Sequence, residues 1–427
     1  MAFKKKTETA RRASGEGGIF QRKSDGMWVG SIELGYDENG RRRQKRVYAK
    51  DYGALVDKLD ELKADAKDGL SINRTMTVAA WVEYWLPNVH REKIRPTTYA
   101  GYVHTINNIK RALGKTKLVD LQPADVRRMA ITLGKGTRRA QKAHVVLHRA
   151  LNDAIAEGLI RRNVAAVVDA PDYVPKARPT FTVVEVHKIL TTALETRNHM
   201  EATRWMYAFL SGTRPGEALG AEWDRLKNLD TPNGAVMDVS WQLQNLTKSH
   251  GCGDKADGVW PCGRKNGWRC PDWKWDFPVK FENRPLHDSL VLTRPKSNAG
   301  ERWVPIIEPL RQALVTLRDM DKGPNPHGLV FHRADGSPVT TKDDNDAFRS
   351  LLKDAGIDEK RALVLYSARH TAATTLRAAG TDEHTRMEIL GHNSPEVTRI
   401  YAHADQARNS VMMEALAVLV PPELNQA

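Results

Sequence analysis

The sequence is short of cysteine and of long apolar runs. It holds 3 cysteines in 427 residues, which argues against a disulfide framework and favours a reducing compartment. No window of about 18 uninterrupted apolar residues occurs, and the mean hydropathy is −0.54, so we expect no membrane span. The first residues, MAFKKKTETARR, are charged with no apolar stretch behind them, so we expect no secretory signal.

Two kinds of catalytic motif are also missing. No GxxxxGKS/T phosphate loop is present, and no obvious cluster of carboxylates for two Mg²⁺ ions stands out. These absences agree with chemistry that needs neither ATP nor a metal ion, and we assign no cofactor.

Acidic side chains are too few to balance the basic ones. Lysine and arginine number 66 against 52 aspartates and glutamates, which gives a net charge of +14. Residues 1–50 alone hold 13 basic and 6 acidic side chains, half of that surplus. A solvated, disordered basic tail explains residues 1–14 but not the patterned residues after them. A polyanion such as a nucleic acid is the natural partner.

The chain divides by pattern into a small mixed segment, a helical segment and a larger mixed segment. Alternating residues around the turn signals Asp25-Gly26 and Asn39-Gly40 predict strands over 18–24, 27–35 and 42–49, followed by a helix to about residue 70. The third strand is basic, with Arg41, Arg42, Arg43, Lys45 and Arg46. Such a sheet can enter the DNA major groove.

Residues 76–170 have helical periodicity throughout. Thr77 is a candidate helix cap, Pro96 a helix start, and residues 123–133 and 136–158 two further helices. Three prolines mark residues 171–179 as a linker. From residue 180 onward we expect a mainly helical domain with a strand-rich section over 236–306, helices resuming at Glu308, Thr341, Tyr366 and His384, and an apolar C-terminal helix over 411–420. The predicted fold class is therefore multidomain α+β.

Four motifs carry residues suited to phosphate chemistry. They are LSGTRPGEALGAEW (210–223), LTRPKSNAGERWVPI (292–306), LYSARHTAATTL (365–376) and LGHNSPEVTRIYAH (390–403). An arginine at a helix start can present a fork of donors to a phosphate, and Glu217 could orient Arg214. Strand-like runs on both sides of residues 298–300 predict Lys296 at a hairpin tip or edge. Singly, each motif also fits an ordinary role, as a surface salt bridge, a core tyrosine or a helix end.

Together, in this order and spacing, the motifs resemble those of the tyrosine recombinase family, the integrases of phages and mobile elements. The resemblance spans roughly residues 180–415, and the PKSxAGxRxVP wording is similar to that of integrases from actinobacterial elements. It implies a catalytic set made of Arg214, Lys296, Tyr366, Arg369, His392 and Tyr401. More loosely, residues 76–170 resemble the family's helical core-binding domain and residues 18–70 its three-stranded arm-type DNA-binding domain. The resemblance thus implies an arm-type domain over 1–70, a core-binding domain over 76–170 and a catalytic domain over 180–427.

The resemblance implies that Tyr401 attacks a DNA phosphodiester and forms a covalent link to the 3′ end, with Lys296 protonating the leaving 5′ oxygen. One position departs from the family pattern. The second arginine box usually begins with His or Lys, whereas here that place holds Tyr366. A tyrosine can donate a hydrogen bond to phosphate but is a poor base near neutral pH, so we expect Tyr366 to position the phosphate.

Residues 244–285 form an insertion that holds all three cysteines, Cys252, Cys262 and Cys270, together with His250 and four tryptophans. Three thiolates and an imidazole can form a tetrahedral zinc site. However, no CxxC pair occurs, and His250 and Cys252 are very close in sequence for chelate partners. We assign no metal ligand from the sequence, and leave open both a zinc site and a loop with ordinary reduced thiols that caps the domain or touches DNA.

The resemblance implies double-stranded DNA with core-type and arm-type attachment sites as the partner, a homotetramer on paired sites, and the cytoplasm of a bacterial host as the location. A host DNA-bending factor and an excisionase are further candidate partners. Three alternatives remain open at this point. They are a type IB topoisomerase with the same chemistry, a DNA-binding regulator that has lost catalysis, and a metal-dependent nuclease or transposase.

Overall fold

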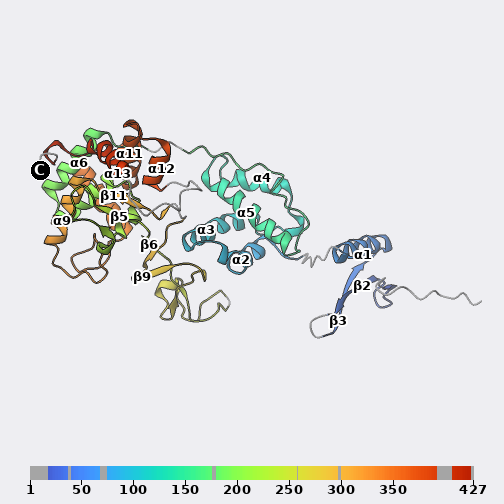
Figure 1. Ribbon diagram of the computed structural model, residues 1–427. Coiled ribbons are helices and arrows are strands. Elements are labelled where there is room, and N and C mark those ends of the chain that lie inside the picture. The colour runs from blue at the N-terminus through green and yellow to red at the C-terminus, as the bar shows by residue number, and fades with distance from the viewer. Residues whose placement is uncertain are drawn as a thin grey trace, which may run out of the picture. The chain divides into compact units, whose positions relative to one another are not determined.

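The computed structural model describes residues 18–36, 40–67, 75–175, 179–256, 258–296, 300–391 and 406–424. The chain divides into two compact units. The first comprises residues up to Ile94 and from Thr98 to Val174, and the second comprises Arg95–Thr97 and residues from Pro175 onward. Each unit is described by itself (Figure 1). The assignment of the N-terminal segments to an arm-type and a core-binding domain stays a prediction.

An antiparallel three-stranded sheet with one helix opens the first unit. The strands β1 (Gly18–Gln21), β2 (Trp28–Tyr36) and β3 (Arg42–Ala49) pair in that order, and α1 (Tyr52–Lys67) packs against β2 and β3 (Figure 1). Ile32, Leu59 and Leu62 form the buried core between sheet and helix. All three predicted strands and the helix are confirmed. The turn at Asp25-Gly26 is confirmed as well, with Gly26 at a φ of 68°, whereas Asn39 of the second predicted turn lies outside the described residues.

Four α-helices make up the rest of the first unit. They are α2 (Val78–Asn88), α3 (Pro96–Leu113), α4 (Pro123–Thr132) and α5 (Arg138–Ala156). Thr77 caps α2 by accepting a hydrogen bond from the Ala80 amide at 3.2 Å, as predicted. The apolar faces meet around the buried tryptophans Trp81 and Trp85, whose indole nitrogens donate to the Ala150 carbonyl and to Asp153.

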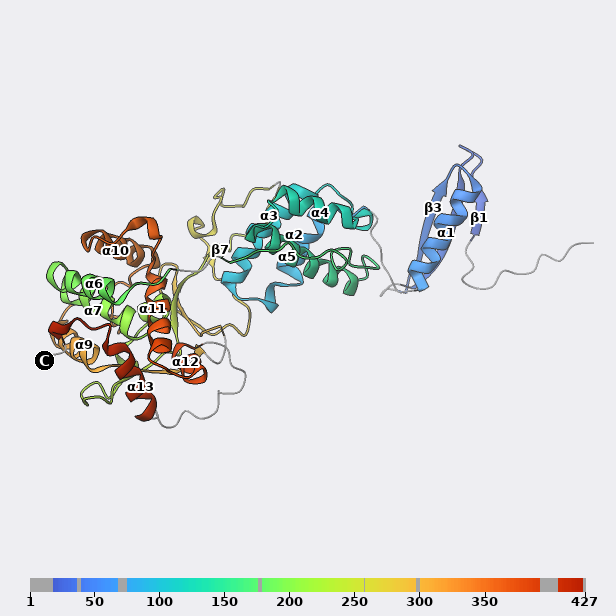
Figure 2. The ribbon, with the colours of Figure 1, turned by 90° about the horizontal axis from the view of Figure 1, so that it is seen from above.

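The second unit is mainly helical, with a large apolar core. Its α-helices are α6 (Val183–Thr196), α7 (His199–Leu210), α8 (Pro215–Leu219), α9 (Glu308–Met320), α10 (Thr341–Asp354), α11 (Leu365–Ala378), α12 (Glu383–Leu390) and α13 (Gln406–Ala417). Helix α11 packs against α7, α12 and α13 (Figure 2). The C-terminal helix was predicted over 411–420, but it begins and ends earlier. No helix among the described residues is long and apolar enough to cross a membrane.

Short antiparallel sheets lie between α8 and α9. Strands β6 (Gln242–Asn245), β10 (Leu290–Thr293) and β9 (Asn283–His287) form one sheet, and β11 (Trp303–Pro305), β5 (Val236–Asp238) and β4 (Leu226–Lys227) form another. Strands β7 (Ser249–His250) and β8 (Trp273–Lys274) form a two-stranded ribbon within the insertion. The strand-rich section and the α+β class are therefore confirmed.

The hairpin predicted around Lys296 is wrong. The strand before it, β10, pairs with β6 and β9, whereas the strand after it, β11, pairs with β5 in a different sheet. The tight turn of this region instead joins β9 to β10 at Asp288, whose φ is 47°. Lys296 therefore lies on a connection between two sheets.

Candidate active site

The first arginine motif forms the turn between α7 and α8. Pro215 supplies the first helical residue of α8, which suits its fixed φ and missing amide hydrogen. Glu217 reaches back and accepts a hydrogen bond from the Arg214 amide at 2.8 Å, so the carboxylate fixes the start of the helix. An added Cβ at Gly216 would lie 2.8 Å from the Leu243 carbonyl oxygen, which explains why glycine stands where α8 meets β6.

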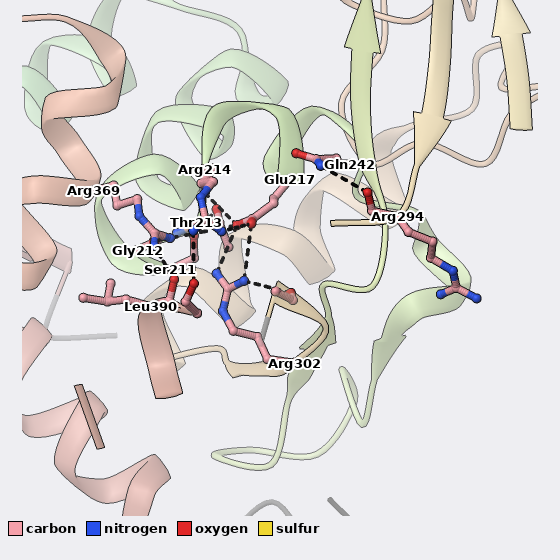
Figure 3. A network of polar contacts seen from close by, with 12 residues as sticks. Ser211, Gly212, Thr213, Arg214, Glu217, Gln242, Arg294, Arg302, Arg369 and Leu390 are labelled. Carbon is pink, nitrogen blue, oxygen red and sulfur yellow. Dashed lines mark hydrogen bonds and ion pairs between the residues drawn. The ribbon is translucent and has the colours of Figure 1, made fainter. Parts of the chain in front are cut away.

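The buried carboxylate of Glu217 lies among three arginines (Figure 3). Arg214 Nη1 donates to Oε1 at 2.6 Å, Arg302 Nη2 donates to Oε2 at 3.0 Å, and Arg369 Nη1 lies 4.0 Å from Oε2. Three guanidinium groups against one carboxylate leave an excess of positive charge. The side chains of Arg302 and Arg369 are each 2% exposed, but that of Arg214 is 32% exposed and is the one an anion reaches most readily.

The same three arginines hold the C-terminal end of α12. Helix ends leave carbonyl oxygens without intrahelical partners, and cations there are favourable. Three consecutive carbonyls each accept from a different arginine: Ile389 from Arg302 Nε at 2.8 Å, Leu390 from Arg369 Nη2, and Gly391 from Arg214 Nη2 at 3.0 Å. The backbone that leads directly into His392 is therefore fixed by the arginine cluster.

The charges in this cluster shift one another's pKa values. Burial alone would raise the pKa of Glu217, but Arg302 and Arg214 outweigh it and lower the pKa to about 2. Burial lowers the pKa of Arg369 to about 10, and the neighbouring Arg214 and Arg302 add to that effect. Burial also acts to lower the pKa of Arg214, but Glu217 more than offsets it and the net shift is upward. All of these groups are charged at neutral pH.

Tyr366 lies beside the exposed arginine of the cluster. It sits in the first turn of α11, and its hydroxyl is close enough to Arg214 to raise the pKa of the guanidinium through a hydrogen bond. Its ring packs edge-on against His370, one turn further along α11, with centroids 5.0 Å apart. The structure thus brings Arg214 of the first motif together with Tyr366 and Arg369 of the third.

The other candidate residues are not gathered in the same way. Lys296 is exposed, and no hydrogen bond or ion pair among the described residues joins it to the arginine cluster. His392 and Tyr401 lie outside the described residues. Their motif enters the structure only through Leu390 and Gly391, which the arginines hold.

Arg302 is the residue that the sequence analysis missed. It stands in the PKSxAGxRxVP segment, yet it gave no signal of its own, because its partner Glu217 lies 85 residues away in the chain. It is nearly as buried as Glu217, and its three guanidinium nitrogens donate to Glu217, Ile389 and Gly300. It connects the turn before α8 to the end of α12.

Two protein-family models match the chain. The model described as "Phage integrase family" matches residues 279–408, and the model described as "Phage integrase, N-terminal SAM-like domain" matches residues 77–133. Among curated proteins, an integrase of Saccharopolyspora erythraea is 25% identical over 417 residues, covering 91% of this chain and 93% of the relative. A XerC-like tyrosine recombinase of Caldanaerobacter subterraneus is 24% identical and covers 90% of this chain and 94% of the relative.

Solved structures with a similar fold include that of the Tn1549 transposon integrase in complex with transposon right end DNA. The TM-score is 0.57 at 20% sequence identity, covering 80% of this chain and all of that one. The same integrase in complex with a circular intermediate DNA gives a TM-score of 0.56. These similarities extend over both units and show that the fold is shared.

Proposed function

We infer that this chain, which belongs to the tyrosine recombinase family, is a site-specific DNA recombinase that integrates or excises a mobile element or phage genome. The family models and full-length relatives support this activity, and several of those relatives are integrases or transposases. DNA is its partner, consistent with the +14 net charge. Among the alternatives, a type IB topoisomerase and a metal-dependent nuclease have no support among these relatives.

The arginine cluster around Glu217 is the observation that carries the proposal. A phosphodiester is anionic, and its pentacoordinate transition state places additional negative charge on the non-bridging oxygens. Preorganised cations stabilise that charge without reorganising during the reaction. Here Glu217 and the carbonyls at the end of α12 hold Arg214 and Arg369 in fixed orientations before any ligand binds. We assign these two arginines to the scissile phosphate, with His392 as a further donor.

We assign the nucleophile to Tyr401. Its oxygen attacks phosphorus, a phosphorus–oxygen bond to the tyrosine forms, and the bond to the 5′ oxygen breaks. The tyrosine gives up its proton to solvent as it attacks, and the leaving 5′ oxygen takes a proton from Lys296, the general acid. The phosphotyrosine keeps the energy of the broken bond, so the strand can be rejoined to another 5′ hydroxyl without ATP.

Tyr366 has the role of orienting the phosphate. Its contact with Arg214 supports this role. Arg214 is the most accessible arginine of the cluster, so a phosphate bound to it would also lie near the Tyr366 hydroxyl. Its position in the first turn of α11 brings it to the same end of the helix as Arg369, three residues further on. There the neutral tyrosine hydroxyl donates the hydrogen bond in place of the His or Lys that the family usually has at this position.

The remaining segments are assigned to DNA recognition and assembly. The basic sheet β1–β3 suits arm-type sites, the helices α2–α5 suit core-type sites, and α13 suits contacts between protomers of a tetramer on paired sites. A host bending factor and an excisionase complete the expected set of partners. The catalytic assignment does not depend on any of them.

A nicked suicide DNA carrying the element's attachment site tests the function. The protein is incubated with it in EDTA, and a protein–DNA adduct that survives denaturant is expected. Metal-independent adduct formation supports the recombinase. Tight binding to a verified site without any adduct would instead support the regulator that has lost catalysis.

A further inference from the structure

The insertion of residues 244–285 brings all three cysteines of the chain to one histidine. His250 ends β7, Cys252 follows two residues later, and Cys270 directly follows the 3₁₀ helix η4 (Gly267–Arg269). Cys262 comes from the loop between them. The ligand atoms of His250, Cys252, Cys262 and Cys270 all lie within 4.8 Å of one another. Segments separated in sequence thus place four donor atoms around a single point.

The distances between these donors match those of a tetrahedral metal site. Ligands bound to zinc at about 2.0–2.3 Å and the tetrahedral angle are roughly 3.6–3.8 Å apart. His250 Nδ1 lies 3.4 Å from Cys262 Sγ and 3.9 Å from Cys252 Sγ. Sulfur and imidazole nitrogen at this spacing need only small shifts to surround one ion.

The insertion has almost no apolar core that would hold it together otherwise. None of the hydrophobic clusters formed by the described residues includes a side chain from residues 249–276. Buried positions in this segment are His250, Gly267 and Cys270, two of which belong to the four-residue cluster. Segments too small to bury a core are usually held by disulfides or by a metal ion.

Neighbouring groups hold the donors in place. The His250 ring stacks on Trp260 with centroids 4.2 Å apart, which fixes the plane of the imidazole. The backbone amides of Gly251 and Asp272 hydrogen-bond to the Cys270 sulfur. An added Cβ at Gly251 would lie 2.0 Å from the Asp272 carbonyl oxygen, and one at Gly267 would lie 2.2 Å from the Lys248 carbonyl oxygen. Both glycines therefore permit the close backbone approach that gathers the cluster.

We propose that His250, Cys252, Cys262 and Cys270 are the four ligands of a structural Zn²⁺ ion that stabilises the insertion. A set of three thiolates and one imidazole is a known closed zinc coordination, and four protein ligands leave no position for a reacting water or substrate. Each cysteine thiol that binds gives up its proton to solvent, and no group is oxidised or reduced. A single disulfide would use two of the cysteines and would not explain why the third thiol and the imidazole lie beside them.

Zinc content of the full chain is the direct test. The protein is purified in reducing buffer without chelator, and bound metal is measured by inductively coupled plasma mass spectrometry. We expect about one zinc per chain, retained against a chromophoric chelator. Cys262→Ser should release its zinc to the same chelator. His250→Asn should behave likewise, whereas the matched control His287→Asn, an exposed histidine outside the cluster, should keep the wild-type content.

Cobalt binding to the wild-type chain keeps the proposal testable if a variant fails to fold. After zinc removal, Co²⁺ should give intense visible d–d bands and a near-ultraviolet thiolate charge-transfer band, which report tetrahedral thiolate ligation. Limited proteolysis should cut the zinc-free chain within residues 249–276. Zinc content near zero in the reduced protein, unchanged content in the Cys262→Ser variant, or a native disulfide among the three cysteines would each overturn the proposal.

Discussion

Arg214 Nη2 donates a hydrogen bond of 3.0 Å to the carbonyl oxygen of Gly391. Gly391 ends α12 in the left-handed region, with φ 64°, and directly precedes His392. The arginine assigned to the phosphate therefore also holds the backbone from which the segment with His392 and Tyr401 departs. The proposed phosphate contact and the end of α12 therefore share one guanidinium group.

Replacing Glu217 by glutamine should destabilise the fold. The variant keeps the size of the side chain but leaves Arg302 and Arg369 buried beside each other without their anion. Breaking a buried ion pair by removing one partner typically costs about 3–5 kcal/mol. Urea unfolding followed by tryptophan fluorescence measures the loss. Asp230→Asn, which breaks an exposed pair with Arg318, is the control and should leave the unfolding midpoint unchanged.

Lowering the pH should remove the contribution of the Glu217 carboxylate to the free energy of unfolding. Its folded-state pKa of about 2 lies below its ordinary value of 4.5, so the carboxylate stabilises the fold above about pH 4.5. That contribution is lost as the pH falls from about 4.5 toward 2, and its full size is roughly 3 kcal/mol. The difference in unfolding free energy between wild type and Glu217→Gln should shrink over this window. A difference that stays constant down to pH 2.5 would contradict the assigned charge state.

Arg302 should affect the rate of DNA cleavage by positioning Glu217 and the end of α12, and not by binding DNA. Lysine in its place keeps the charge but cannot donate to Glu217 and to Ile389 together. Small displacements of groups that position a site can cost about 100-fold in rate. We expect single-turnover cleavage by Arg302→Lys to fall by about that factor while DNA affinity stays near wild type. Equal losses of binding and cleavage would indicate a general folding defect.

Lys296 should speed DNA cleavage only on substrates whose leaving 5′ oxygen must be protonated. A Lys296→Ala variant should cleave ordinary DNA much more slowly, by about 100-fold or more. A substrate with sulfur in place of the bridging 5′ oxygen should restore the rate, because a thiolate leaves without protonation. Cleavage of the two substrates is compared in one assay. If the sulfur substrate gives no rescue, Lys296 is not the general acid.

The sequence predicted those parts of the fold that are coded locally. The Thr77 cap, the proline starts at Pro96 and Pro123 and the turn at Asp25-Gly26 need only neighbouring residues, and all were placed correctly. The pairing of β10 and β11 was wrong, because strand partners are chosen by contacts between distant segments. Alternation of apolar residues marks a strand but does not name its partner.

In the candidate site, too, residues marked by a local sequence pattern were predicted and those that depend on distant contacts were not. Arg214 and Arg369 were predicted from their helix starts, and the structure places both at Glu217. The role of Arg302 depends on a carboxylate and a helix end far away in sequence, so no local pattern marked it. The cysteines were counted correctly, but their wide and irregular spacing hid the convergence that the β7–β8 ribbon produces.

Mass spectrometry of the covalent adduct identifies which tyrosine attacks the DNA. The adduct formed on nicked DNA is digested with nuclease and trypsin, and the peptide that carries the nucleotide is sequenced. We expect the peptide of residues 400–408 with the phosphate on Tyr401, and no adduct from Tyr401→Phe, while Tyr366→Phe still forms one. Nucleotide on the peptide of residues 362–369, at Tyr366, would contradict the account and move the nucleophile to α11.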